Sequence, residues 1–195
     1  LLAVHANKMF AANTIENSVS YPNRVRWSHD SLPEDWMTDD YLDVEGGGNG
    51  ITGLAVVSGQ LVIFKPRAIF VLFGYDSDSF TIVELSNHLG ISTPRNAAQS
   101  DVGLYFFSYP EGFHYYNGSS IKNIFNQLQP IMDLNYLDVT TKPVDVSWVN
   151  NRVWFAVPYS TTGTAATKAT VNFVYDPSIS DAGTYTVSYT HLTLP

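Results

Sequence analysis

The feature that most constrains this fold is one short pattern, a tight turn followed by an apolar run of strand length. The pattern occurs four times, and the runs begin at Met9, Leu61, Leu104 and Val153. The steps between them are about 52, 43 and 49 residues, a period typical of repeat proteins built from small sheets. A recurrence of this kind predicts several similar strand units along the chain.

Residues 51–85 show the unit most clearly. The tight pair Ser58-Gly59, the segment Lys65-Pro66-Arg67 and the loop 74–78 separate strand-length runs. Glycine and proline favour turns at such places, and proline cannot donate to a strand ladder. The four expected strands are 54–57, 60–64, 68–73 and 80–85. Four consecutive short antiparallel strands make one blade of a β-propeller.

The other units follow the same pattern more loosely. In the third, Asn117-Gly118 is a strong hairpin signal, and we prefer this interpretation to a glycosylation sequon. The first unit is the least regular, with a polar loop between its two expected strands. The remaining expected strands are 9–12, 24–28, 103–108, 113–116, 119–124, 144–148, 152–157 and 170–175. One short connector helix is expected over 125–137, with Pro130 in its first turn.

Composition supports an all-β class. Charged residues make up 14% of the chain and aromatic residues another 14%, a balance that suits buried strands. We therefore predict a partial β-propeller of about four blades, each an antiparallel four-stranded meander. A β-sandwich is the alternative, and it explains the alternation of side chains but not the recurrence.

Charge and residue content exclude several functions. The formal net charge is −8 and no basic run is present, which argues against nucleic-acid binding. The chain has no cysteine, so disulfides and thiolate sites are excluded. No apolar stretch is long enough for a membrane-spanning helix.

The protein is expected to be truncated at both ends. Residue 1 is Leu, and residues 187–195 resemble a translated sequencing-adapter tail. We expect residues 1–186 to be a propeller segment truncated at both ends, and 187–195 to be non-native.

One glycine-rich loop is a weak metal candidate. Asp43, Glu45 and Asn49 have a spacing like that of a calcium loop. However, Leu54 stands where a bidentate Glu is needed, and a strand follows the glycines. No Lys-Ser or Lys-Thr pair completes a phosphate loop. We expect a solvated loop between blades, with no metal and no cofactor.

No catalytic residue is predicted. Ser28-His29-Asp30 contains the residue types of a hydrolase triad, but triad members meet in space from separate segments. The remaining carboxylates show no pair suited to glycoside hydrolysis. A polar turn is the expected structure at 28–30.

Two tryptophans frame the segment 27–36. We interpret Trp27, Pro33, Asp35 and Trp36 as a structural clasp, in which Pro33 begins a turn and Trp36 packs back over the strand. The alternative is a platform on which a ligand stacks.

Several motifs in order resemble the β-propeller virion proteins of tailed bacteriophages. The similarity covers roughly residues 5–180, and the motifs are 23–28, 33–36, 43–44, 51–56, 61–65, 69–72, 103–106 and 115–118. The resemblance implies a tail, head–tail junction or stabilisation protein, located in the virion. It implies no catalysis and no cofactor. The implied partners are other virion proteins and further copies of the chain in a ring assembly.

Two other functions stay open at this point. A propeller enzyme of the glycosidase type predicts carboxylates gathered at one end of a central channel. A carbohydrate- or cell-surface-binding propeller predicts exposed Trp and Tyr on one loop face.

Overall fold

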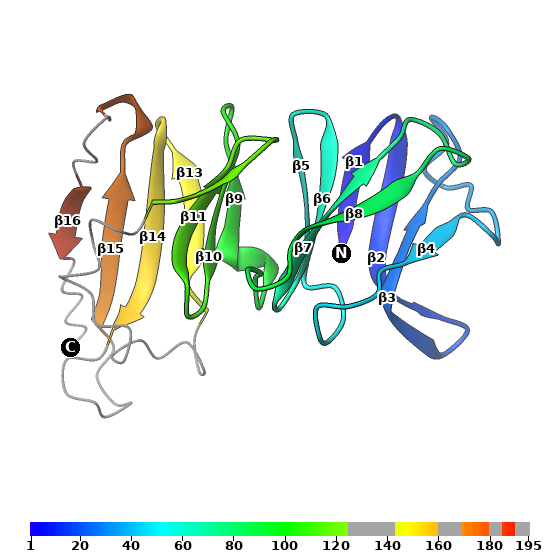
Figure 1. The fold of residues 1–195 in the computed structure, drawn as a ribbon, viewed down its shortest axis with the longest axis horizontal. Helices are drawn as coiled ribbons and strands as arrows, with labels where there is room; N and C mark the ends of the chain where they lie inside the picture. The colour runs from blue at the N-terminus through cyan, green and yellow to red at the C-terminus, as the bar shows by residue number, and fades with distance from the viewer. Residues whose placement is uncertain (125–142, 160–168, 180–184, 190–195) are drawn as a thin grey trace. The chain divides into compact units, whose positions relative to one another are not determined.

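The chain folds into four separate four-stranded antiparallel sheets, as a computed structural model shows (Figure 1). The structure describes residues 1–124, 143–159, 169–179 and 185–189. In each sheet the strands are neighbours in chain order. The predicted all-β meander is therefore confirmed.

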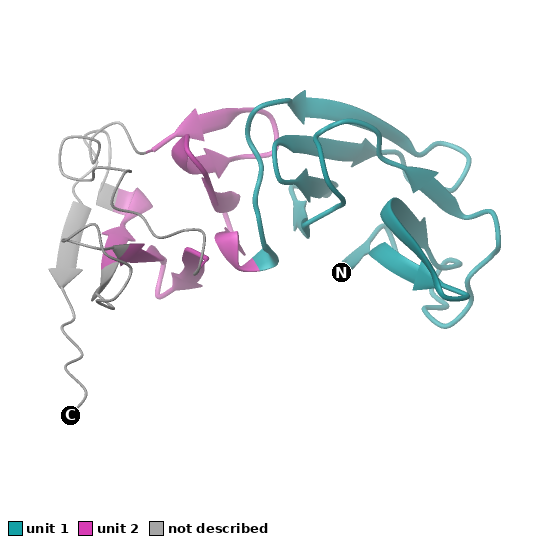
Figure 2. Cartoon of the chain, turned by 90° about the horizontal axis from the view of Figure 1, so that it is seen from below, with its two compact units in different colours: residues 1–94 teal, residues 95–195 magenta. Residues whose placement is uncertain are grey.

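The strands divide between two compact units, residues 1–94 (unit 1) and 95–195 (unit 2), coloured separately in Figure 2. Unit 1 contains β1 (Leu2–His5), β2 (Lys8–Glu16), β3 (Val19–Trp27), β4 (Tyr41–Asp43), β5 (Gly53–Val57), β6 (Gln60–Lys65), β7 (Ala68–Phe73) and β8 (Thr81–Ser86). Unit 2 contains β9 (Ala97–Gln99), β10 (Leu104–Ser108), β11 (Gly112–Tyr116), β12 (Ile121–Asn123), β13 (Asp145–Val149), β14 (Arg152–Tyr159), β15 (Ala169–Tyr175) and β16 (Tyr185–Tyr189).

Two-residue turns close the tightest hairpins. Both residues of each turn have positive φ, which matches the right-handed twist of the flanking strands. The four pairs are Ala6-Asn7, Asn17-Ser18, Ser58-Gly59 and Asn150-Asn151. Asparagine and glycine tolerate this conformation, so these turns fix the strand register locally.

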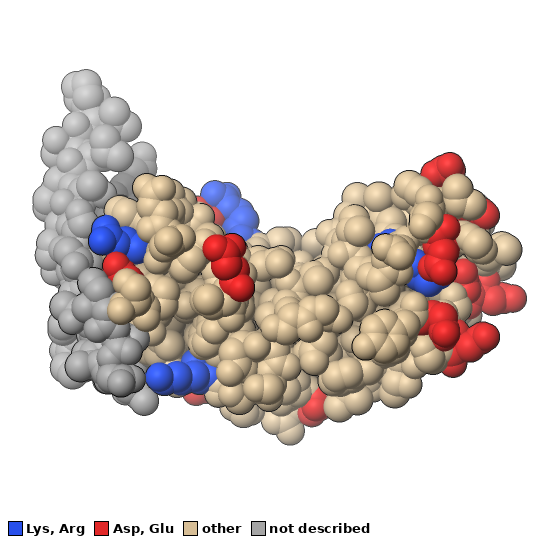
Figure 3. Space-filling view, turned by 90° about the horizontal axis from the view of Figure 1, so that it is seen from above, with Lys and Arg blue, Asp and Glu red and all other residues tan. Residues whose placement is uncertain are grey.

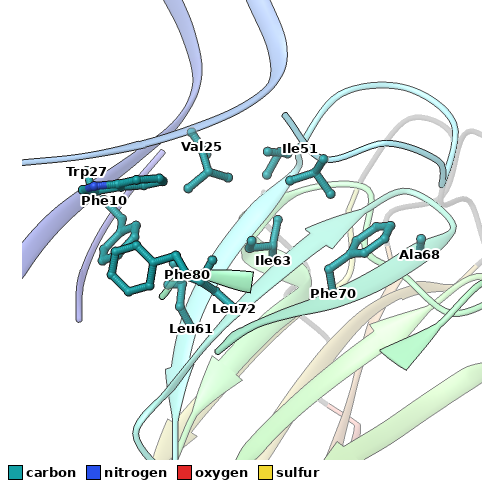
Figure 4. Packing of buried hydrophobic residues seen from close by; sticks show 12 residues of the cluster. Phe10, Val25, Trp27, Ile51, Leu61, Ile63, Ala68, Phe70, Leu72 and Phe80 are labelled. Atoms are coloured by element: carbon teal, nitrogen blue, oxygen red, sulfur yellow. The ribbon is translucent and has the colours of Figure 1, made fainter. Parts of the chain in front are cut away.

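The core of unit 1 lies between its two sheets (Figure 4). Strands β6 and β2 contribute Leu61, Ile63 and Phe10, all fully buried. The Phe80 ring meets the edge of Phe10 at 5.6 Å and of Trp27 at 5.0 Å between ring centroids. Such edge-to-face pairs add to the stabilisation from apolar burial.

Unit 2 has its own aromatic core. Phe113 of β11 lies 4.3 Å from Phe155 of β14 and 6.0 Å from Phe173 of β15, measured between ring centroids. Tyr105 stacks on Trp148 with an interplanar angle of 8°. Burial in this core raises the pKa of Tyr105.

The first unit of the sequence is more regular than expected. Its predicted polar loop is a hairpin, because β2 and β3 pair from Glu16↔Val19 back to Phe10↔Trp27, with a bulge between Ala12 and Thr14. A four-stranded sheet thus replaces the two short strands expected there. The Asn117-Gly118 hairpin is confirmed, since β11 pairs with β12.

Helix is limited to short 3-10 turns in the described residues, Pro94–Asn96 and Pro177–Ile179. The connector helix expected over 125–137 lies outside the described residues. Residues 187–189 of the expected tail belong to β16, and 190–195 are outside the description. Over the ranges that are described, no helix combines the length and hydropathy needed to cross a bilayer.

Candidate protein-interaction surface

Two loops meet at one end of unit 1. The first, residues 28–40, follows β3, and the second, residues 74–80, joins β7 to β8. The indole nitrogen of Trp27 donates to the hydroxyl of Ser77 at 2.9 Å, across fifty positions of sequence. We call the surface formed by these two loops the loop surface.

The segment at Ser28 is held by hydrogen bonds to Met9 of β2. Ser28 is fully buried, and its hydroxyl accepts from the amide of Met9 at 3.0 Å and donates to the His29 carbonyl at 3.0 Å. Asp30 pairs with the Lys8 ammonium at 2.7 Å. The three residue types of a triad are therefore adjacent without the triad arrangement, because the serine hydroxyl donates to a carbonyl and not to the imidazole.

The clasp residues make two separate contacts. Trp36 is half-buried and donates from its indole nitrogen to the Pro33 carbonyl at 2.8 Å. The Asp35 carbonyl accepts from the amide of His29 at 2.8 Å, which closes the loop. Trp27 instead lies in the core, 3% exposed. The structure brings Pro33 and Trp36 together, and it connects Trp27 to the second loop.

The second loop is ordered by its own side chains. Asp76 accepts from the amide of Ser79 at 2.9 Å, while the Ser79 hydroxyl accepts from the amide of Tyr75 at 3.1 Å. Hydrogen bonds from the side chain and the amide of Ser79 favour the ionised carboxylate and hold the pKa of Asp76 below its usual value. Tyr75 projects from this preformed turn with 85% of its surface exposed.

The loop surface combines apolar and acidic side chains. Leu32 is 44% exposed and Met37 53% exposed, in addition to Tyr75. The carboxylates of the two loops are those of Asp30, Glu34, Asp35, Asp39, Asp40, Asp76 and Asp78. Acidic side chains gather where unit 1 lies in the space-filling view (Figure 3). The nearby Lys8 is buried, so the exposed charge of these loops is negative.

A charged network beside this surface was not predicted. The Arg24 guanidinium lies between the rings of Tyr21 and Tyr41, 3.9 and 3.7 Å from their centroids. It also donates twice to the Asp43 carboxylate, at 3.0 and 3.1 Å. The hydrogen bond with Asp43 raises the pKa of Arg24. Arg24 and Asp43 are cross-strand partners of β3 and β4, but the sequence does not reveal their register.

The calcium candidate loop is organised around the chain's own cation. Lys65 is fully buried, and its ammonium donates to the carbonyls of Val44 at 2.7 Å and Gly46 at 2.6 Å. Asp43 is paired with Arg24, while Glu45 and Asn49 are exposed. Throughout the described ranges, no three His, Asp or Glu side chains come together as a metal site.

Comparison with known proteins identifies the fold. No family model matches the chain, and no curated protein is similar to it in sequence. Among solved structures, the chain is similar to the N-terminal domain of Nup159, with a TM-score of 0.56 and 11% identity over 97% of this chain. The chain spans 47%, about half, of that domain's length. The likeness shows a propeller-like fold in agreement with the sequence prediction.

Proposed function

We propose that this chain is a non-catalytic propeller-type scaffold that binds another protein through the loop surface of unit 1. The observation that carries the proposal is the exposure of Tyr75, Met37 and Leu32 among seven carboxylates. Apolar side chains supply contact area when buried against a partner, and the carboxylates select a basic one. The partner we infer is a protein segment with Lys or Arg next to apolar side chains.

The internal order of both loops supports this proposal. Trp36 and Pro33 brace the first loop, and Asp76 with Ser79 braces the second. The indole of Trp27, the residue just before the first loop, donates to Ser77 of the second. A preformed surface loses little conformational freedom when a partner binds, which leaves more of the contact energy for affinity.

A peptide titration with a matched control tests the surface. The probe is a synthetic peptide of alternating Lys and Leu, measured by fluorescence anisotropy. The Glu34→Gln/Asp39→Asn variant removes two charges from the loop surface, and Asp101→Asn/Glu111→Gln removes two exposed charges from unit 2. We expect about threefold weaker binding for the first variant only, because exposed ion pairs are individually weak. Equal weakening in both variants, or none, would overturn the choice of surface.

We place this scaffold in the particle of a tailed bacteriophage, as a tail or head–tail junction component. The support for this setting is the resemblance of the ordered motifs, such as 23–28 and 33–36, to propeller virion proteins. Its partners are then other virion proteins.

Carbodiimide coupling in purified particles tests this assignment, because the reagent joins a carboxylate directly to a neighbouring lysine. We expect mass spectrometry to find the chain in the particles and to find couplings at residues 30–40 and 76–78. Asp101 and Glu111 serve as internal controls. Absence of the chain from particles would remove the phage setting, while the peptide result would still decide the scaffold proposal.

A further inference from the structure

The chain contains two Asn-Gly pairs in opposite situations. Asn49-Gly50 ends the glycine-rich loop before Ile51, and Asn117-Gly118 lies in the turn between β11 and β12. Asparagine followed by glycine is prone to deamidation, since glycine has no side chain to hinder ring closure. Local structure then decides whether the asparagine side chain can reach the next backbone nitrogen.

The Asn117 side chain is fixed by its own turn. Its Oδ1 accepts from the amides of Ser119 and Ser120, both at 2.9 Å, and from the Ser119 hydroxyl at 3.0 Å. Attack on the Asn117 carboxamide requires the side chain to rotate out of this arrangement. Breaking three hydrogen bonds slows that rotation.

Asn49 has the opposite environment. It is exposed, and its side chain makes no hydrogen bond to any residue that the structure describes. Gly46, Gly47 and Gly48 precede it, with φ of 81°, 70° and 86°. Nothing lies within 4 Å of the Cβ position at Gly48, so there is open space beside the residue that precedes Asn49.

We propose that Asn49 is a spontaneous modification site, which converts to aspartate and isoaspartate while Asn117 stays intact. The Gly50 backbone nitrogen, after losing its proton, bonds to the Asn49 side-chain carbonyl carbon. The C–N bond of the amide breaks and ammonia leaves, which yields a succinimide. Water then opens either ring carbonyl. The net reaction consumes one water and releases one ammonia for each carboxylate formed.

Conversion changes the loop in two ways. It adds a negative charge to a segment that already carries Asp43 and Glu45. The isoaspartyl product also adds one carbon to the backbone just before Gly50, where the packing is tight. A Cβ at Gly50 would lie 2.6 Å from the Pro22 side chain, and the Ile51 amide donates to the Pro22 carbonyl at 2.8 Å. Displacing Ile51 disturbs the core of unit 1.

Peptide mapping of the aged protein tests the proposal. Trypsin releases Asn49 within 27–67 and Asn117 within 96–122, so mass spectrometry follows the two sites separately. After incubation at pH 8 and 37 °C, we expect Asn49 to convert at least about tenfold faster than Asn117. Equal rates, or faster conversion at Asn117, would overturn the assignment.

A second incubation in urea separates structure from sequence. Both sites have the same Asn-Gly pair, so unfolding is expected to bring their rates close together. A large difference that persists in urea would show that the fold does not protect Asn117. Asn49→Gln is the variant control, and it is expected to abolish the mass change in 27–67 without altering 96–122.

Discussion

At the scale of single residues, the buried Lys65 is the most consequential polar group in unit 1. Its ammonium donates to the carbonyls of Val44 and Gly46. The glycine-rich loop that follows β4 is therefore organised around a cation from the chain itself. Burial lowers the pKa of Lys65, because the charged form is poorly solvated, and the nearby Glu45 opposes this shift. The side chain thus fixes the loop at a desolvation cost.

Replacing Lys65 with methionine tests this role. The apolar stem stays, but the Val44 and Gly46 carbonyls lose their donor. We expect the free energy of unfolding to fall by about 1–3 kcal/mol, the usual effect of an unsatisfied buried acceptor. Urea denaturation measures it, and Lys122→Met at an exposed position is the control. A stability equal to that of the control would show that the ammonium is dispensable.

His5 makes folding sensitive to mild acid. Burial lowers the pKa of His5 below its usual value of 6.5, so the unfolded chain binds a proton more readily than the folded one. The free energy of unfolding therefore rises with pH while the unfolded chain loses this proton, and it declines as pH falls below about 6.5.

Urea midpoints at pH 7.5 and 5.5 measure the effect. We expect His5→Gln to show a smaller decline between these pH values than the unmodified chain, and His29→Gln, at an exposed position, to show the same decline. If all three proteins lose equal stability between these pH values, the decline arises from groups other than His5.

At the scale of elements, the sequence predicts strands whose burial is continuous and misses strands that are short or largely exposed, such as β1, β4 and β9. Strand β6 is buried from Leu61 to Lys65, and its apolar residues 61–64 predict a strand. Strand β3 is polar in its first half and follows a bulge, so it resembled a loop. The Trp27–Ser77 hydrogen bond of the candidate site joins β3 to the loop between β7 and β8, and no local pattern predicts a contact of that kind.

Close backbone approach at Gly90 predicts a difference between two glycine substitutions. A Cβ at Gly90 would lie 2.6 Å from the Pro66 carbonyl carbon, which cannot move freely. At Gly53 it would lie 2.7 Å from the end of the Ile91 side chain, which can rotate. We expect Gly90→Ala to destabilise the protein by about 1–3 kcal/mol, and Gly53→Ala by less. Thermal unfolding of both variants provides the comparison, and the reverse order would contradict this account.

At the scale of the whole molecule, the recurrence of about fifty residues correctly predicted four meander sheets. It could not predict their grouping into two units with separate cores. That grouping depends on which apolar faces meet, and the strands of all four sheets carry similar side chains. Phe10 and Phe113, for example, both lie in aromatic clusters but in different units.

The acidic isoelectric point has a consequence for solubility. The sequence pI is about 4.8, and repulsion between molecules weakens as net charge approaches zero. We expect turbidity at fixed protein concentration to peak near pH 4.8 and to fall on either side. A maximum well away from this pH would indicate that unfolding, rather than loss of net charge, limits solubility.

The position of Trp27 gives the molecule a built-in optical probe. Its indole is 3% exposed, lies edge-on to Phe80 just before β8 of the neighbouring sheet, and donates to Ser77. The emission wavelength of an indole depends on the polarity around it. A variant that keeps Trp27 as its single tryptophan would therefore emit at short wavelength while the two sheets of unit 1 are packed together. A shift of that emission to longer wavelength would mark the moment at which water enters between them.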